Sequence, residues 1–172
     1  QIRQGNEDGL FDTASSLCHC SHTIVKPFGS GMEDRPGISQ NSWTFGLAQL
    51  FTSASPEVTK EFEVPYVSRI FEQFGDVYYG CCERLDDRLD ILEALPNVRK
   101  ISCSPWSNPE HFASVLNKRY IMSNKPNPAF VGPGDLDASK REMENVIRAA
   151  KSHGTRLEMI LKDNSTVHYH PE

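Results

Sequence analysis

The sequence predicts an α/β fold built on a parallel sheet. From residue 55 onward, short apolar runs typical of buried strands alternate with longer segments whose apolar residues recur at helical spacing. Four such strands with intervening helices are the pattern of a parallel sheet. The sequence has no glycine-rich phosphate loop after a strand, which disfavours a nucleotide-binding doubly wound domain. Periodicity alone does not choose between a doubly wound sheet and part of a barrel.

The first predicted helix begins at 55–57, where the sequence Ser-Pro-Glu supplies an N-cap, a proline for the first turn and an acid at the positive end of the helix dipole. Pro65 should kink this helix, and Gly75 should end it. The residues predicted to face inward are Val58, Phe62, Tyr66, Ile70 and Phe74. An apolar run at 77–81 is the first predicted strand.

Three further units are expected to follow. In order, they are a helix over 85–95, a strand over 98–103, a helix from Ser107, a strand over 120–123, a helix over 137–152 and a strand over 156–161. Ser107 and Glu110 have the spacing of a capping box. The residues predicted to be buried on the last two helices are Phe112, Val115, Leu116, Met143, Val146, Ile147 and Ala150.

The segment before these units has a different character. Residues 1–41 are rich in glycine and carry little periodic signal, so we expect a long loop with at most one short strand. Residues 42–172 are expected to form a single, incomplete domain of βα units. The chain starts with Gln1 rather than methionine, which we interpret as a sign that it is part of a longer protein.

Composition and charge exclude some partners. The chain has 172 residues and a net charge of -5, and its basic residues are scattered, so nucleic acid is not an expected partner. No apolar run approaches the roughly 18 residues of a membrane span. The five cysteines are an odd number without regular spacing, which favours a reducing, cytoplasmic setting over a disulfide scaffold.

Polar and reactive residues follow each predicted strand. In α/β barrels the active site lies at the carboxyl ends of the strands. The candidates at these ends are Cys81, Cys82 and Glu83 after the first strand, Ser104 and Trp106 after the second, Lys125 and Asn127 after the third, and Asp163 after the fourth. Each also has a structural interpretation, because free cysteines are often buried, acids often cap turns, tryptophan often packs, and a lysine can be a plain loop charge.

A second group of residues suggests a metal. Cys18, His19, Cys20 and His22 offer sulfur and imidazole ligands, but Cys-x-Cys is tighter than the usual structural zinc spacing. His168 and His170 alternate near the end of the chain, and terminal exposed histidines explain them as well.

Several segments together resemble the C-terminal half of proteins of the uroporphyrinogen decarboxylase superfamily. They are Ser42-Trp43-Thr44-Phe45, Ser55-Pro56-Glu57, Tyr79-Gly80-Cys81-Cys82-Glu83-Arg84-Leu85-Asp86, Ser102-Cys103-Ser104-Pro105-Trp106, Ser123-Asn124-Lys125-Pro126-Asn127-Pro128 and Leu161-Lys162-Asp163-Asn164-Ser165-Thr166. The resemblance implies the C-terminal half of a (β/α)₈ TIM barrel with four parallel strands. Four more units would lie upstream, so the chain alone would lack a complete active site.

The resemblance implies two kinds of activity. Members include cofactor-free porphyrinogen decarboxylases, which are lyases, and cobalamin- or coenzyme-M-linked methyltransferases that use zinc. The methyltransferases place His-x-Cys at a strand end; the matching segment 79–81 keeps the cysteine but has Tyr79 in place of the histidine. The decarboxylases' catalytic aspartate and arginines lie in the half that is absent, and their late His-Gly is replaced by 162–165.

These observations lead to a working hypothesis. The chain would belong to a barrel lyase or methyltransferase that acts on a small anionic substrate. Asp163 and Glu83 would be catalytic; Lys125, Trp106, Ser104 and Asn127 would bind the substrate; Cys81 and Cys82 would be metal ligands for zinc, and a corrinoid is the other possible cofactor. The expected partner is the missing N-terminal half or a homodimer mate. The alternative is a non-catalytic half-barrel that binds a tetrapyrrole or corrinoid, or is only structural.

Overall fold

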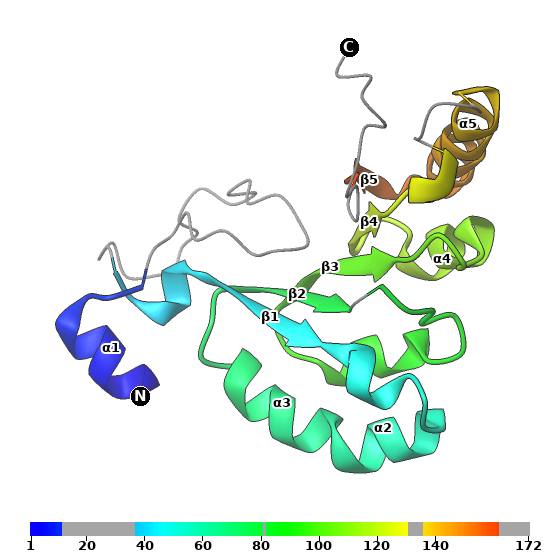
Figure 1. The fold of residues 1–172 in the computed structure, drawn as a ribbon. Helices are drawn as coiled ribbons and strands as arrows, with labels where there is room; N and C mark the ends of the chain where they lie inside the picture. The colour runs from blue at the N-terminus through cyan, green and yellow to red at the C-terminus, as the bar shows by residue number, and fades with distance from the viewer. Residues whose placement is uncertain (12–36, 81, 131–135, 162–172) are drawn as a thin grey trace. The chain divides into compact units, whose positions relative to one another are not determined.

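The computed structural model of the chain describes residues 1–11, 37–80, 82–130 and 136–161 (Figure 1). It has an α/β fold with one sheet of five parallel strands in the order β1-β2-β3-β4-β5. The strands are β1 (Trp43–Leu47), β2 (Asp76–Gly80), β3 (Val98–Cys103), β4 (Ile121–Asn124) and β5 (Arg156–Met159). The predicted parallel α/β fold is confirmed, but the expected strand number of four was wrong, because β1 precedes the first predicted helix.

Helices and helical turns connect the strands. They are α1 (Ile2–Asp8), η1 (Ser39–Asn41), η2 (Ala48–Phe51), α2 (Pro56–Phe62), α3 (Val64–Phe71), η3 (Leu89–Ala94), α4 (Pro109–Leu116), η4 (Pro128–Phe130) and α5 (Leu136–His153). The expectation of an irregular segment over 1–41 was wrong at α1, and residues 12–36, with the cysteine and histidine cluster at 18–22, lie outside the described residues. None of the described helices is long and apolar enough to cross a membrane.

The chain divides into two compact units, which we describe separately. Unit 1 contains residues 1–79 and 90–100; unit 2 contains residues 80–89 and 101–172.

In unit 1, the predicted kinked helix is two helices that meet at Glu63. The Ser55 hydroxyl accepts a hydrogen bond from the Val58 N–H (3.4 Å), as expected for the N-cap. The second helix ends at Phe71 rather than at Gly75, because the Asn97 side-chain amide donates to the carbonyl oxygens of Phe71 (3.1 Å) and Phe74 (2.9 Å). These bonds satisfy carbonyl groups that a helix end leaves open.

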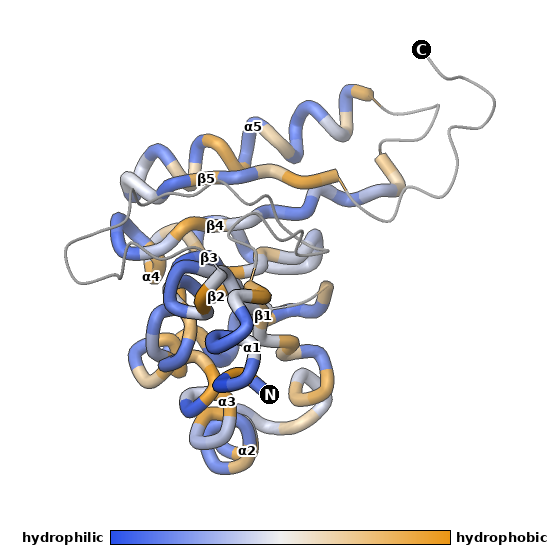
Figure 2. Tube along the Cα trace, turned by 90° about the vertical axis from the view of Figure 1, so that its left-hand side faces the viewer, coloured by the Kyte–Doolittle hydropathy of each residue, from blue (hydrophilic) through white to orange (hydrophobic). Residues whose placement is uncertain are grey.

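The inward face of these two helices differs from the prediction. Thr59, Glu63 and Phe71 are buried, whereas the predicted inward residues Val58, Phe62, Tyr66 and Ile70 are exposed, and of the predicted set only Phe74 is buried. A polar contact explains the rotation: the Tyr79 hydroxyl on β2 donates to Glu63 Oε2 (3.0 Å), so a carboxylate takes a position that hydrophobic periodicity assigns to solvent. Figure 2 shows that apolar and polar residues alternate along α2 and α3.

The two faces of the strands in unit 1 carry different neighbours. Gly46 lies against the rings of Phe71 and Tyr79, so this face is covered by α3. On the opposite face, Phe45 and Tyr78 stack with ring centroids 5.2 Å apart. Side chains alternate between the faces of a strand, so the face covered by α3 and the face that carries Phe45 and Tyr78 are distinct along β1 and β2.

The predicted helix over 85–95 was wrong in type. Its leucines are all buried, but the only helical element that the structure describes there is the 3₁₀ turn η3. A separate i to i+3 bond, from Arg88 N–H to Leu85 O (3.1 Å), precedes this turn. Leu89, Leu92 and Leu95 are three residues apart, a spacing that lies on one side of a 3₁₀ turn as well as on one side of an α-helix.

Unit 2 is closest to the prediction. The apolar faces of α4 and α5 bury Phe112, Leu116 and Val146, while the predicted inward residues Val115 and Ile147 are more than one-third exposed. The N-cap of α4 was predicted one residue too early. Asn108 Oδ1 accepts from the N–H groups of Glu110 (3.0 Å) and His111 (3.2 Å), so the expected Ser107 cap was wrong.

Candidate functional site

Alternation along β3, β4 and β5 gives unit 2 an apolar face and a polar face. Asn124 Nδ2 lies 3.8 Å from Cys103 Sγ, which places these two residues on one face together with the buried Ile101 and Met122. The helix α4 contacts β4, and α5 contacts β5. The other face, which we call the polar face, carries Ser102, Ser104, Ser123, Lys125 and Glu158, and the buried Ile121 lies on it at the start of β4.

Lys125 is the first residue after β4 and is 1% exposed. Its N–H donates to the Cys103 carbonyl oxygen (2.9 Å), so the parallel pairing of β3 and β4 continues through this residue. Its Nζ donates to Ser102 Oγ at 2.5 Å. The strand ladder therefore fixes the backbone of Lys125, and Ser102 holds its ammonium group at the polar face.

Hydrogen bonds also connect other members of the polar face. Ser123 faces Glu158 across the β4–β5 pair, and its hydroxyl donates to Glu158 Oε1 (2.8 Å). Ser104 Oγ lies 3.1 Å from Ser107 Oγ and accepts from the Trp106 N–H (3.3 Å). The result is a row of hydroxyl, ammonium and carboxylate groups at the carboxyl ends of three neighbouring strands.

The remaining predicted residues take different positions. Trp106 is 62% exposed after β3. Asn127 has a structural role, because its N–H donates to both carboxylate oxygens of Glu142 on α5 (3.2 and 3.1 Å) and its Oδ1 accepts from the Ala129 N–H (3.0 Å). Its side chain is thus occupied in closing a turn.

Of the candidate residues that follow β2, the structure describes Cys82 and Glu83 but not Cys81. Cys82 is half-buried and Glu83 is exposed. Cys81 and Asp163 lie outside the described residues, as do His168 and His170. Within the part of the chain that the structure describes, no group of three or more metal-ligating side chains comes together. The proposed zinc ligands Cys81 and Cys82 therefore stay a prediction.

Burial makes Cys103 a structural thiol. Desolvation raises its pKa to about 12, although the Asn124 amide acts in the opposite direction. A thiol with this pKa carries almost no thiolate near neutral pH and is a poor nucleophile or metal ligand. Cys103 therefore belongs to the core.

Sequence reasoning missed Ser102, Ser123 and Glu158. Each lies inside a strand, next to apolar residues, so the sequence predicts a buried strand there and does not single out the polar residue. The signal that could have found the first two is their spacing from Ser104 and Lys125, which places each pair two residues apart on one face of a strand.

Comparisons with family models, with curated proteins and with solved structures give no match for the chain.

Proposed function

We propose that the chain is part of a (β/α)₈-barrel enzyme similar to uroporphyrinogen decarboxylases, acting as a lyase or a corrinoid-dependent methyltransferase, and inactive without the rest of the barrel. The strand order supports the barrel. When each parallel strand lies beside the preceding one, right-handed crossovers place every connection on the same face of the sheet. A doubly wound sheet instead reverses its strand order.

The observation that carries the functional part is the position of Lys125. Its ammonium group is buried at the carboxyl end of β4 beside Ser102, on the face opposite Cys103 and Asn124. In the proposed barrel this polar face would line the interior, where the active site of such enzymes lies. A cation held there by the strand ladder and by Ser102 suits a substrate carboxylate, because ammonium–carboxylate hydrogen bonds are about twice as strong as neutral ones. We propose that Lys125 holds a carboxylate of the substrate and that Asp163 and Glu83 serve in proton transfer.

Binding of a carboxylated porphyrin tests this role. We expect the full chain to bind uroporphyrin, followed by porphyrin fluorescence, and Lys125→Met to weaken this binding about tenfold or more. Lys140→Met is the matched control, because Lys140 is exposed on α5. Equal affinities of wild type and Lys125→Met would refute the role of Lys125.

A non-catalytic tetrapyrrole-binding module is the second candidate. The exposed indole of Trp106 favours it, since a flat aromatic side chain next to Ser104 offers a surface for a macrocycle. This candidate predicts binding without turnover by the complete protein, with affinity reduced in Trp106→Ala.

A further inference from the structure

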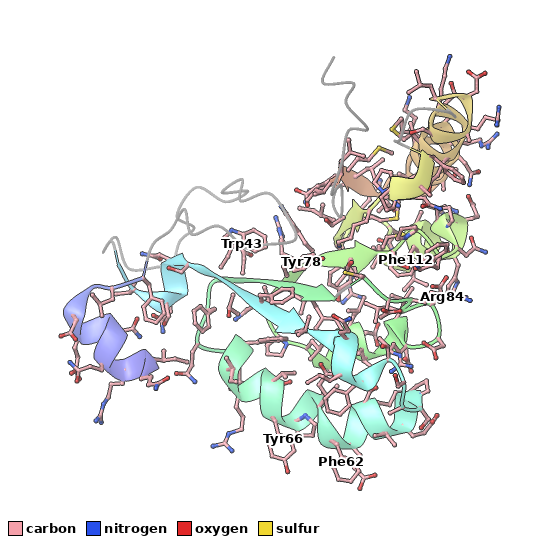
Figure 3. All side chains as sticks on the ribbon, in the orientation of Figure 1. Trp43, Phe62, Tyr66, Tyr78, Arg84 and Phe112 are labelled. Atoms are coloured by element: carbon pink, nitrogen blue, oxygen red, sulfur yellow. The ribbon has the colours of Figure 1, made fainter. Side chains whose placement is uncertain are left out.

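An exposed apolar ridge runs along α2 and α3 of unit 1. Its residues are Val58 (37% exposed), Phe62 (56%), Tyr66 (64%) and Ile70 (46%). They are spaced by four residues, so Val58 and Phe62 lie in line on α2, and Tyr66 and Ile70 lie in line on α3. Figure 3 shows the Phe62 and Tyr66 side chains projecting away from β1 and β2. In this segment Thr59 and Glu63 are buried beside Phe71, while the four apolar ridge residues face solvent.

We propose that this ridge binds the same ridge of a second copy of the chain, with the two helix pairs antiparallel. Rows of this spacing interdigitate in the commonest class of helix packing. A two-fold axis between Phe62 and Tyr66 places Phe62 of one copy against Tyr66 of the other, and Val58 against Ile70. Aromatic residues thus meet at the centre and aliphatic residues at the ends, which is the self-complementarity that an isologous interface requires.

Charge complementarity supports the antiparallel direction. The residues that directly precede the ridge residues form a second row of Glu57, Glu61, Pro65 and Arg69, and all except the proline are exposed charges. Acids occupy the N-terminal end of this row and the base occupies the C-terminal end. Backbone and Ser55 hydrogen bonds lower the pKa of Glu57, so its carboxylate stays ionised.

In the antiparallel arrangement, Arg69 of one copy lies opposite the stretch between Glu57 and Glu61 of the other. A parallel pair would not bring Arg69 of one copy near Glu57 or Glu61 of the other, because the two ends of the row would stay at opposite ends of the interface. The two-fold axis repeats each favourable pairing, so the arrangement gains two of them at the rim.

Sedimentation velocity over a range of concentrations tests the proposal with the full chain. We expect a reversible dimer, and we expect Phe62→Ala and Tyr66→Ala each to raise its dissociation constant about thirty-fold, as for aromatic residues at the centre of an interface. Leu136→Ala is the control, because Leu136 is 77% exposed in unit 2. Circular dichroism verifies that each variant keeps its fold.

Charge reversal tests the direction of the two helix pairs. We expect Glu61→Arg and Arg69→Glu each to weaken the dimer and the double variant to restore it. A monomeric wild type would overturn the proposal and assign the ridge to a different protein. A dimer that survives both ridge substitutions would also overturn it, and would indicate association through another surface. A double variant that stays as weak as the single ones would overturn the antiparallel arrangement.

Discussion

At the scale of single residues, the buried carboxylate of Glu63 helps to set which face of α2 and α3 is buried. Glu63 is 3% exposed and accepts from the Tyr79 hydroxyl at 3.0 Å. Removing one partner of a buried hydrogen bond leaves the other desolvated, which costs about 1–3 kcal/mol. We expect Tyr79→Phe to lower the free energy of unfolding by this amount in urea titration.

Removing the hydroxyl group from an exposed tyrosine is the control for Tyr79→Phe. The Tyr66 side chain is 64% exposed, so at a protein concentration at which the chain is monomeric its hydroxyl meets solvent in both the folded and the unfolded chain. Tyr66→Phe should therefore leave the free energy of unfolding within about 0.5 kcal/mol of wild type. Equal effects of the two substitutions would contradict the structural role of Glu63.

The Cys103 thiol makes stability depend on alkaline pH. Burial raises its folded-state pKa from 9.0 to about 12. The thiol thus contributes stability that is fully present below pH 9 and is lost as pH rises toward 12, since the unfolded chain releases the proton first. We expect the difference in unfolding free energy between wild type and Cys103→Ala to be smaller at pH 10 than at pH 7, and a constant difference would refute this.

At the scale of elements, the start of α4 shows why helix boundaries are hard to place. Ser107 and Asn108 are both good N-cap residues, and the sequence cannot choose between them. In the structure the Asn108 side chain caps the helix, while Ser107 Oγ lies next to Ser104 Oγ. We expect Asn108→Ala to cost about 1 kcal/mol of stability.

Ser107→Ala is the matched comparison for this cap. It should cost less than Asn108→Ala in thermal and urea unfolding, because it removes no bond to the helix N-terminus. A larger loss of stability in Ser107→Ala than in Asn108→Ala would instead identify Ser107 as the N-cap.

The elements also differ in how far the sequence predicts them. The strands β3 and β4 and the long helix α5 are confirmed within one or two residues, because apolar runs and periodicity are strong over these segments. β1 was missed, since its five residues follow a glycine-rich segment with little periodic signal. For α2 and α3, the periodicity of apolar residues correctly predicted helices but predicted the wrong buried face. Apolar residues usually lie on the buried face of a helix, whereas here an apolar ridge is exposed and Glu63 is buried.

The candidate site was partly predictable for a similar reason. Lys125 and Ser104 follow their strands directly, so the rule for strand ends in barrels located them. Ser102, Ser123 and Glu158 depend on the register between strands, which the sequence alone does not supply.

At the scale of the whole molecule, parallel strands in consecutive order support two linked proposals. One is that the sheet belongs to a barrel whose interior is lined by the polar face. The other is that residues at the carboxyl ends of its strands act on a carboxylated substrate. The complete protein is the proper object for both, because the proposed barrel needs units that this chain does not supply.

Activity of the complete protein tests the central claim most directly. Release of carbon dioxide from a carboxylated tetrapyrrole and methyl transfer from a corrinoid would be assayed side by side, with zinc content measured on the same sample. The account predicts one of the two activities, reduced about tenfold or more by Lys125→Met and by Asp163→Asn. Neither activity, or one that persists unchanged when Asp163 and both Cys81 and Cys82 are replaced, would contradict it.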